Sequence, residues 1–108
     1  MTSATVDTSA DHGEVRITLS GEIDLANSST VDEQIRAAVS GQPTAVSVDL
    51  TDLTYMDSVG LRLLFDLAAH LRESHIALKL IAPFESPTRR LIQFSRLDSL
   101  ATLQPASG

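Results

Sequence analysis

The sequence predicts a single α/β domain with a mixed, mostly parallel sheet of four or five strands and about three helices. Three observations support this. The chain has 108 residues, which is the length of one domain. Short β-branched runs alternate with longer segments of helical periodicity, an order that gives parallel strands joined by right-handed crossovers. The first two runs are separated only by a short turn, so we expect them to form an antiparallel hairpin.

The strands are predicted from alternation and from β-branched composition. After a turn-like Asp-His-Gly sequence at 11–13, Val15, Ile17 and Leu19 alternate with polar residues, as in a strand with one buried face. Later apolar runs are short enough to be buried strands. The expected strands are 4–8, 15–19, 45–50 and 76–82, with an edge strand near 100–103.

Three helices are expected to start near Ser28, Ser58 and Ser86. Thr30 and Glu33 have the spacing of a capping box in the first helix. In the second helix, apolar residues recur at helical spacing opposite a polar face, which predicts one buried side. That apolar face comprises Leu61, Leu64, Phe65, Ala68 and Leu71.

The composition argues against a polyanion as partner. The net charge is −6, and Lys79 is the only lysine. Binding to nucleic acid or to an anionic membrane would favour a basic stripe. The single basic pair, Arg89-Arg90, is interpreted as a solvated helix face. No apolar run reaches the roughly 18 residues of a membrane span, and the N-terminus lacks signal-peptide features. We therefore expect a cytoplasmic protein that binds another protein, with no nucleic acid and no membrane span.

Catalytic chemistry is also disfavoured. The chain has no cysteine, and Ser58 lies in Met-Asp-Ser-Val-Gly rather than the G-x-S-x-G of a nucleophile elbow. A histidine base is not within reach, because His12 lies in the hairpin turn and His70 and His75 lie about 20 Å along the second helix or beyond it. No phosphate-binding loop is present. We expect no catalytic residues and no bound cofactor.

Four aspartates near the expected strand ends raise the possibility of a Mg²⁺ site like that of a phospho-receiver. The arrangement does not match, because a receiver has paired acids after its first strand and a lysine near the end of its fifth. Turn formation and helix capping explain aspartates in such positions. We therefore expect no metal site. These aspartates are Asp24, Asp49, Asp52 and Asp57.

The Asp57-Ser58 pair at the start of the second helix has two compatible interpretations. Either side chain can cap the helix, which contributes about 0.5–2 kcal/mol. A serine at an exposed helix start can also accept a phosphate, which adds roughly −1.5 to −2 charge near the positive end of the helix dipole. Gly60 would let another surface approach closely. The residues alone leave capping and modification both open.

Three segments make the sequence resemble the STAS domain family, and within it the bacterial anti-sigma factor antagonists. The specific one is "VSVDLTDLTYMDSVGLRLL" at 46–64, which is similar to the family's central signature ending in D-S-x-G. The segment "LSGEIDLANSS" at 19–29 resembles the family's L-x-G-E-[IL]-D, and residues 77–100 follow its later strand and helix. The resemblance covers residues 4–103, which we take as the domain, with flexible ends at 1–3 and 104–108.

The resemblance implies a phosphorylation switch at Ser58. In this family the unphosphorylated antagonist binds an anti-sigma factor that is also its serine kinase, which frees a sigma factor. Phosphorylation blocks the binding, and a serine phosphatase restores it. Asp24 and Asp57 would then flank the docking surface. The residues expected to contact the partner are Asp24, Asp57, Ser58, Val59, Gly60 and Arg62.

The alternative is a STAS-like docking subunit of a transport or stress-signalling assembly. Such a subunit needs a docking face but no phosphorylated serine. A serine at position 58 favours the switch.

Overall fold

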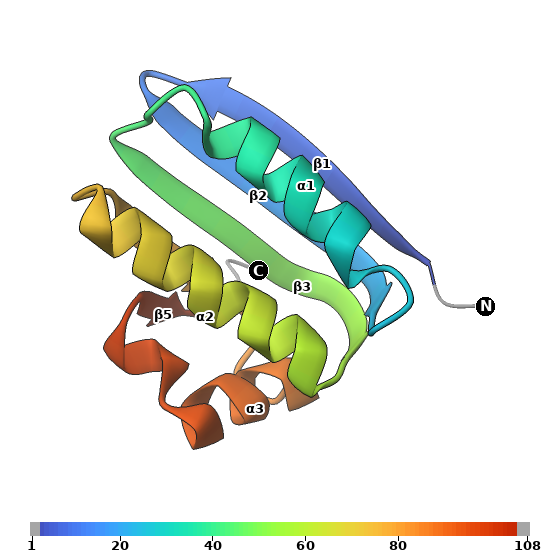
Figure 1. Cartoon of the computed structure of the whole chain (residues 1–108). Helices are drawn as coiled ribbons and strands as arrows, with labels where there is room; N and C mark the ends of the chain where they lie inside the picture. The colour runs from blue at the N-terminus through green and yellow to red at the C-terminus, as the bar shows by residue number, and fades with distance from the viewer. Residues whose placement is uncertain (1–2, 106–108) are drawn as a thin grey trace.

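The computed structural model describes residues 3–105, which form one five-stranded mixed sheet with helices packed against it (Figure 1). The strand order is β1-β2-β3-β4-β5; the pair β1–β2 is antiparallel and the other pairs are parallel. The predicted α/β class and N-terminal hairpin are therefore confirmed. In chain order the elements are β1 (Ala4–Asp11), β2 (Glu14–Ile23), α1 (Ser28–Val39), β3 (Ala45–Met56), α2 (Ser58–Glu73), β4 (Ala77–Ile81), α3 (Pro87–Ser95), a 3-10 turn (Leu97–Ser99) and β5 (Thr102–Gln104).

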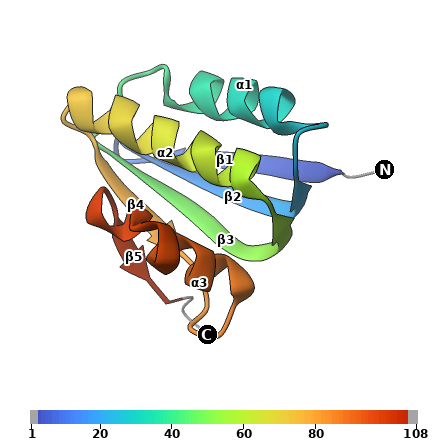
Figure 2. The ribbon, with the colours of Figure 1, turned by 60° about the horizontal axis from the view of Figure 1, so that its bottom comes forward.

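Helices α1 and α2 lie side by side over one face of the sheet, and α3 lies beside the β4–β5 end (Figure 2). The core fills the space between these helices and the strands. Ile17 of β2, Val48 of β3 and Leu80 of β4 each have no exposed surface, and they face Ile35 of α1 and Leu71 of α2 in the same apolar cluster. Burying a side chain of this size contributes about 1.5–3 kcal/mol, so this layer supplies the main stabilisation. None of the helices in the described range is long and apolar enough to cross a bilayer.

Strand β3 is twice as long as predicted, because its alternation changes partway along. Up to Leu50 every second residue is buried, but the next buried residues are Leu53 and Met56, three positions apart. Its pairing with β2 shifts register twice over this stretch. Each shift adds a residue to β3, as a β-bulge does. A strand with bulges does not keep an alternation of buried and exposed residues. The strand predicted from that alternation therefore ended at residue 50.

The buried side of α2 is wider than predicted. Leu63 and Leu67 are buried together with the expected Leu64, whereas Leu61 and Phe65 are only half-buried. The expected polar side is exposed. The helix therefore turns the predicted side towards the sheet, but it is rotated slightly about its axis. The spacing of apolar residues in the sequence is too coarse to predict this rotation.

The first helix lacks the predicted capping box. It begins at Ser28 with Asn27 as N-cap residue, and Thr30 lies within its first turn. Asn27 makes no capping bond; its amide instead donates to the Glu22 carbonyl at 2.8 Å and accepts from the Asp24 N–H at 3.0 Å. The loop between β2 and α1 is thus fixed by hydrogen bonds of Asn27 within the loop rather than by a capping box.

The predicted solvated face at Arg89-Arg90 is wrong for Arg89. Arg90 is exposed, but Arg89 is only 7% exposed and donates from Nη1 to the Ala82 carbonyl at 2.7 Å. Its guanidinium also lies 4.6 Å from the centre of the Phe84 ring, which is a cation–π distance. Arg89 therefore joins the end of β4 to α3.

The ordered sheet extends slightly beyond the expected domain of 4–103. The Ser3 carbonyl accepts a hydrogen bond from the Glu22 N–H at 2.9 Å, and Gln104 belongs to β5. These two residues were expected in flexible ends. The rest of both ends, 1–2 and 106–108, lies outside the described residues, and 105 follows β5 directly.

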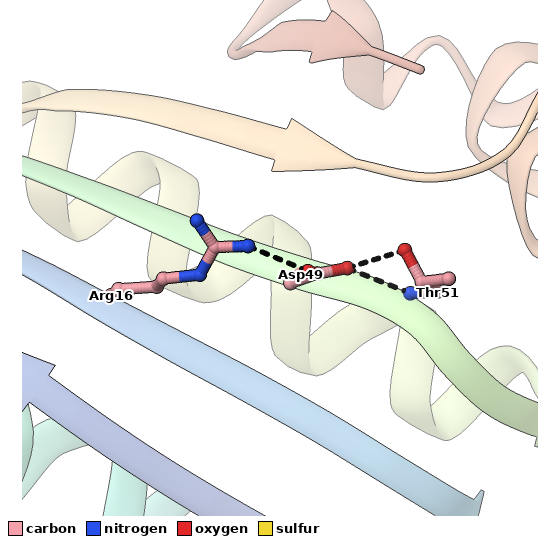
Figure 3. A network of polar contacts seen from close by, with 3 residues as sticks. All are labelled: Arg16, Asp49 and Thr51. Carbon is pink, nitrogen blue, oxygen red and sulfur yellow. Dashed lines mark hydrogen bonds and ion pairs between the residues drawn. The ribbon is translucent and has the colours of Figure 1, made fainter. Parts of the chain in front are cut away.

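The sheet face away from the helices is polar. There Arg16 of β2 donates to Asp49 of β3 at 2.8 Å, and the Thr51 hydroxyl and N–H donate to the same carboxylate at 2.6 and 3.0 Å (Figure 3). Burial alone would raise the pKa of Asp49, but the Thr51 hydrogen bonds and the Arg16 charge outweigh it and hold that pKa below its usual value. This network lies at the first register shift of β3 and stabilises it.

Candidate docking surface around Ser58

The residues around Ser58 are brought together where β2 and β3 end. Ile23 and Met56 are paired as the last residues of these two parallel strands. The Asp57 N–H then donates to the Ile23 carbonyl at 3.4 Å. Asp24 and Asp57 therefore leave the sheet at the same edge from neighbouring strands.

Asp57 is the N-cap of α2. Its backbone is extended, with φ −95° and ψ −169°, and its Oδ1 accepts from the N–H groups of Val59 at 3.0 Å and Gly60 at 3.2 Å. Both bonds satisfy donors that have no partner inside the helix. The sequence left the cap open between Asp57 and Ser58, and the structure assigns it to Asp57.

Ser58 is consequently the first helical residue and has no capping role. Its side chain is exposed, and its hydroxyl makes no hydrogen bond to any of residues 3–105. An exposed hydroxyl at the start of a helix is accessible to another protein from outside.

Asp24 shapes the loop that runs beside Ser58. The residue is half-buried, and its Oδ1 accepts from the Ala26 N–H at 2.9 Å. Its backbone carbonyl accepts from the N–H of Asn27 at 3.3 Å and of Ser28 at 3.0 Å. Asp24 therefore fixes the turn into α1 and at the same time places a carboxylate at this edge.

Gly60 serves the fold rather than an approaching surface. It is buried, and a Cβ atom there would lie 2.4 Å from Met56 Cγ and 3.2 Å from Ile23 Cγ2. Real Cβ atoms do not approach this closely. The close approach that Gly60 permits is therefore that of its own strands, and its contact with a partner stays a prediction.

Val59 and Arg62 complete the set that the sequence singled out. Val59 is half-buried beside Gly60, and Arg62 is exposed one turn after Ser58. Within the described part of the chain, Arg62 has no ion pair or hydrogen bond from its side chain. It is therefore a free cation in an otherwise acidic neighbourhood.

Two apolar residues at this edge were missed by the sequence reasoning. Leu25 follows Asp24 and is 77% exposed, and Tyr55 precedes Met56 and is 50% exposed. Large exposed apolar side chains that flank polar groups are typical of interaction surfaces. In the sequence, Leu25 and Tyr55 look like ordinary members of apolar segments, and only their exposure in the structure separates them from the core. We call Asp24, Leu25, Tyr55, Asp57, Ser58 and Arg62 the Ser58 surface.

The three histidines considered as catalytic bases lie away from the Ser58 surface. His12 lies in the β1–β2 turn, and His70 and His75 lie in the last turn of α2 and just after it. In the range 3–105 there is no group of three or more acidic or histidine side chains that could hold a metal ion.

A hollow with a volume of about 540 Å³ lies on the polar sheet face, where Arg16 of β2, Ser47 of β3 and Lys79 of β4 are paired across neighbouring strands. Its lining does not include Ser58 or the aspartates beside it. The Ser58 surface is therefore distinct from this hollow.

A mixed five-stranded sheet with helices on one face, and an exposed serine at the first helical position after the central strand, defines the chain as a STAS-type domain. The chain belongs to the STAS domain family: the family model described as "Mlab, STAS domain" matches residues 6–104. The resemblance read from the signature segments is thus confirmed.

Several known proteins are similar to the chain. The anti-sigma-F factor antagonist RsfB of Mycobacterium tuberculosis is 35% identical over 92 residues, which is 84% of this chain and 74% of RsfB. The crystal structure of an anti-sigma factor antagonist from Mycobacterium paratuberculosis superposes with a TM-score of 0.86 at 29% identity, covering 96% of this chain and 87% of that one. SpoIIAA in its unphosphorylated form gives a TM-score of 0.77 at 25% identity, over 95% and 89% of the two chains.

Proposed function

We propose that the protein is an anti-sigma factor antagonist whose activity is switched by phosphorylation of Ser58. The observation that carries the proposal is the exposed Ser58 hydroxyl, which has no structural task because Asp57 caps the helix. In the unphosphorylated form, the Ser58 surface binds an anti-sigma factor and releases the sigma factor. The anti-sigma factor is also the kinase, and it transfers the γ-phosphoryl group of ATP to Ser58 Oγ and releases ADP. A separate phosphatase hydrolyses the phosphoserine.

The charges of the Ser58 surface explain how one phosphate blocks binding. Asp24 and Asp57 already make this edge acidic, and a phosphate adds roughly −1.5 to −2 more. A partner that fits the unphosphorylated edge then faces an extra anion that must be desolvated at the interface. Leu25 and Tyr55 supply apolar area for the contact, and apolar anchors of this kind provide much of the binding energy of interfaces.

Two structures of one similar protein, SpoIIAA, support a switch that acts on the surface rather than on the fold. SpoIIAA has been solved in the unphosphorylated form and, as the Bacillus cell fate determinant, in the phosphorylated form. The present chain superposes on the two with TM-scores of 0.77 and 0.73. RsfB is named as the antagonist of an anti-sigma factor, which is the partner class proposed for this chain. We propose a cytoplasmic location on the same grounds, because a partner that uses ATP is expected there.

The proposal is tested first by phosphoryl transfer. The protein is incubated with ATP and a candidate anti-sigma factor, and its intact mass is measured. We expect a gain of one phosphate in the wild type and none in Ser58→Ala. Phosphate that remains in Ser58→Ala would place the modification at another residue.

The second test is a pair of titrations against the same anti-sigma factor. Ser58→Ala should bind like the unphosphorylated wild type, and Ser58→Asp should bind at least about tenfold more weakly, which corresponds to about 1.4 kcal/mol. Ser74→Asp is the matched control, since it adds the same charge at the far end of α2, where Ser74 is exposed. Equal binding by Ser58→Asp and Ser74→Asp would show that charge at position 58 is not the switch.

A further inference from the structure

We propose that Arg62 holds the phosphate of phosphorylated Ser58 in an ion pair within helix α2. The inference rests on the proposed phosphorylation of Ser58 and adds a second consequence to it. Phosphorylation would then both add negative charge to the Ser58 surface and withdraw its one free arginine from a partner.

Most N–H groups that could bind a phosphate at the start of α2 are already occupied. Phosphates at such positions bind the unpaired N–H groups of the first turn. In α2, Asp57 Oδ1 accepts from two of these groups, Val59 N at 3.0 Å and Gly60 N at 3.2 Å. The next N–H along the chain, that of Leu61, donates to the Asp57 carbonyl at 3.0 Å. A phosphate on Ser58 therefore has the N–H of Ser58 itself as a backbone donor and a carboxylate as neighbour, which favours a counter-charge from a basic side chain.

Arg62 is the cation in the right place. It lies four residues after Ser58 on the same helix, and residues with this spacing are neighbours on one face. Both side chains are exposed, and the guanidinium has no partner within the described residues. Its planar N–H groups match phosphate oxygens two at a time. A rotation of exposed side chains is enough to form the pair, and the backbone need not move.

Helix α1 contains the same arrangement already formed. Asp32 and Arg36 are four residues apart, and the Arg36 Nε donates to Asp32 Oδ2 at 3.0 Å. The acidic residue precedes the basic one, which is the order that helices favour. Arg62 and Asp66 have the same spacing in the reverse order, and no ion pair joins them. Phosphate on Ser58 would create the favoured order, with the anion one turn before the arginine.

The test is a titration of the phosphate itself. Phosphoserine is placed at position 58 during protein synthesis, so no kinase is needed, and ³¹P NMR follows its second ionisation. An ion pair favours the dianion, so it lowers this pKa. We expect the pKa to rise by about 0.2–0.4 in Arg62→Gln relative to the wild type.

Arg72→Gln is the matched control. It removes the same charge from the same helix, 14 residues from Ser58 and thus about 21 Å away, and it should leave the pKa within about 0.1 units of the wild type. Arg62→Lys should lower the phosphoserine pKa less than arginine does but more than glutamine, since lysine keeps the charge but not the fork of N–H groups. An equal pKa in wild type, Arg62→Gln and Arg72→Gln would overturn the proposal.

This result is independent of the partner experiments. If the pKa responds to Arg62 but no anti-sigma factor binds, the proposed function fails and the ion pair stands. If phosphate blocks the binding of an anti-sigma factor but the phosphoserine pKa is the same in Arg62→Gln and wild type, the ion pair fails and the proposed function stands.

Discussion

Helices α2 and α3 both begin beside a serine, but the two serines have different roles. At α3, Ser86 is the N-cap: its Oγ accepts from the Arg89 N–H at 3.1 Å and donates to the Pro83 carbonyl at 3.0 Å. At α2, Asp57 is the N-cap and Ser58 is the first helical residue. The two serines differ by one position relative to the cap. The hydroxyl of Ser86 is therefore used in capping, whereas that of Ser58 is free to react.

The third helical residue differs as well. In α2 it is Gly60, which brings the helix start against Met56 and Ile23. In α3 it is Arg89, whose long side chain folds back onto Ala82. The start of α2 is thus packed directly on the ends of β2 and β3, and Ser58 is presented on a rigid base. The start of α3 is held instead by one arginine and one hydroxyl.

The largest expected effect comes from breaking this close packing. Gly60→Val places a Cβ 2.4 Å from Met56 Cγ, so the Met56 side chain or the start of the helix must shift. We expect a loss of about 2–4 kcal/mol in the free energy of unfolding, measured by urea denaturation. Gly41→Ala is the control, since nothing lies within 4 Å of a Cβ there. A loss no greater than that of the control would mean that the helix start is not tightly seated.

The next effect tests the cap of α2. Asp57→Ala removes the acceptor of two N–H groups and a negative charge from the positive end of the helix. The expected loss is about 1–2 kcal/mol by thermal unfolding. Asp57→Asn keeps an accepting oxygen, so its loss of stability should be at most half that of Asp57→Ala. If Asp57→Ala is as stable as the wild type, another group caps α2 and Ser58 loses its special position.

The cap of α3 should be slightly weaker. Ser86→Ala leaves one N–H without its acceptor and removes the bond to Pro83, for an expected loss of about 1 kcal/mol in the free energy of unfolding. Ser86→Thr keeps the hydroxyl and serves as the control. If Ser86→Ala leaves the free energy of unfolding unchanged, Ser86 does not stabilise α3 as a cap, and the two serines do not differ in their structural role.

The smallest expected effect is the most informative. Ser58→Ala should change the free energy of unfolding by no more than about 0.5 kcal/mol, because the exposed hydroxyl makes no hydrogen bond within the described chain. Chemical denaturation of Ser58→Ala and Ser86→Ala in parallel gives the comparison directly. A loss at Ser58 as large as that at Ser86 would restore Ser58 as a structural cap.

The sequence by itself determined the order of the elements, the three helix starts and the position of the site. Apolar residues recur every two residues in a strand and every 3.6 residues in a helix when one side of the element is buried. These periods are local, so the strands and helices could be predicted from the sequence. The signature around Ser58 is a continuous segment, so the family and the candidate serine could also be recognised from it. The N-terminal hairpin followed from a turn between two adjacent strands.

Only the tertiary structure decided how those residues are used. Asp57 and Ser58 offer oxygens to the same first turn, and the pairing of Ile23 with Met56 fixes the backbone so that Asp57 provides the cap. The bulges of β3 depend on its contacts with β2, and the burial of Arg89 depends on a carbonyl at the end of β4. The exposure of Leu25 and Tyr55 depends on which elements reach that edge. The cap and the bulges arise from contacts between strands distant in sequence, and the burial of Arg89 arises from the fold of the turn between β4 and α3. Neither kind of contact is recorded in a periodic pattern of apolar residues.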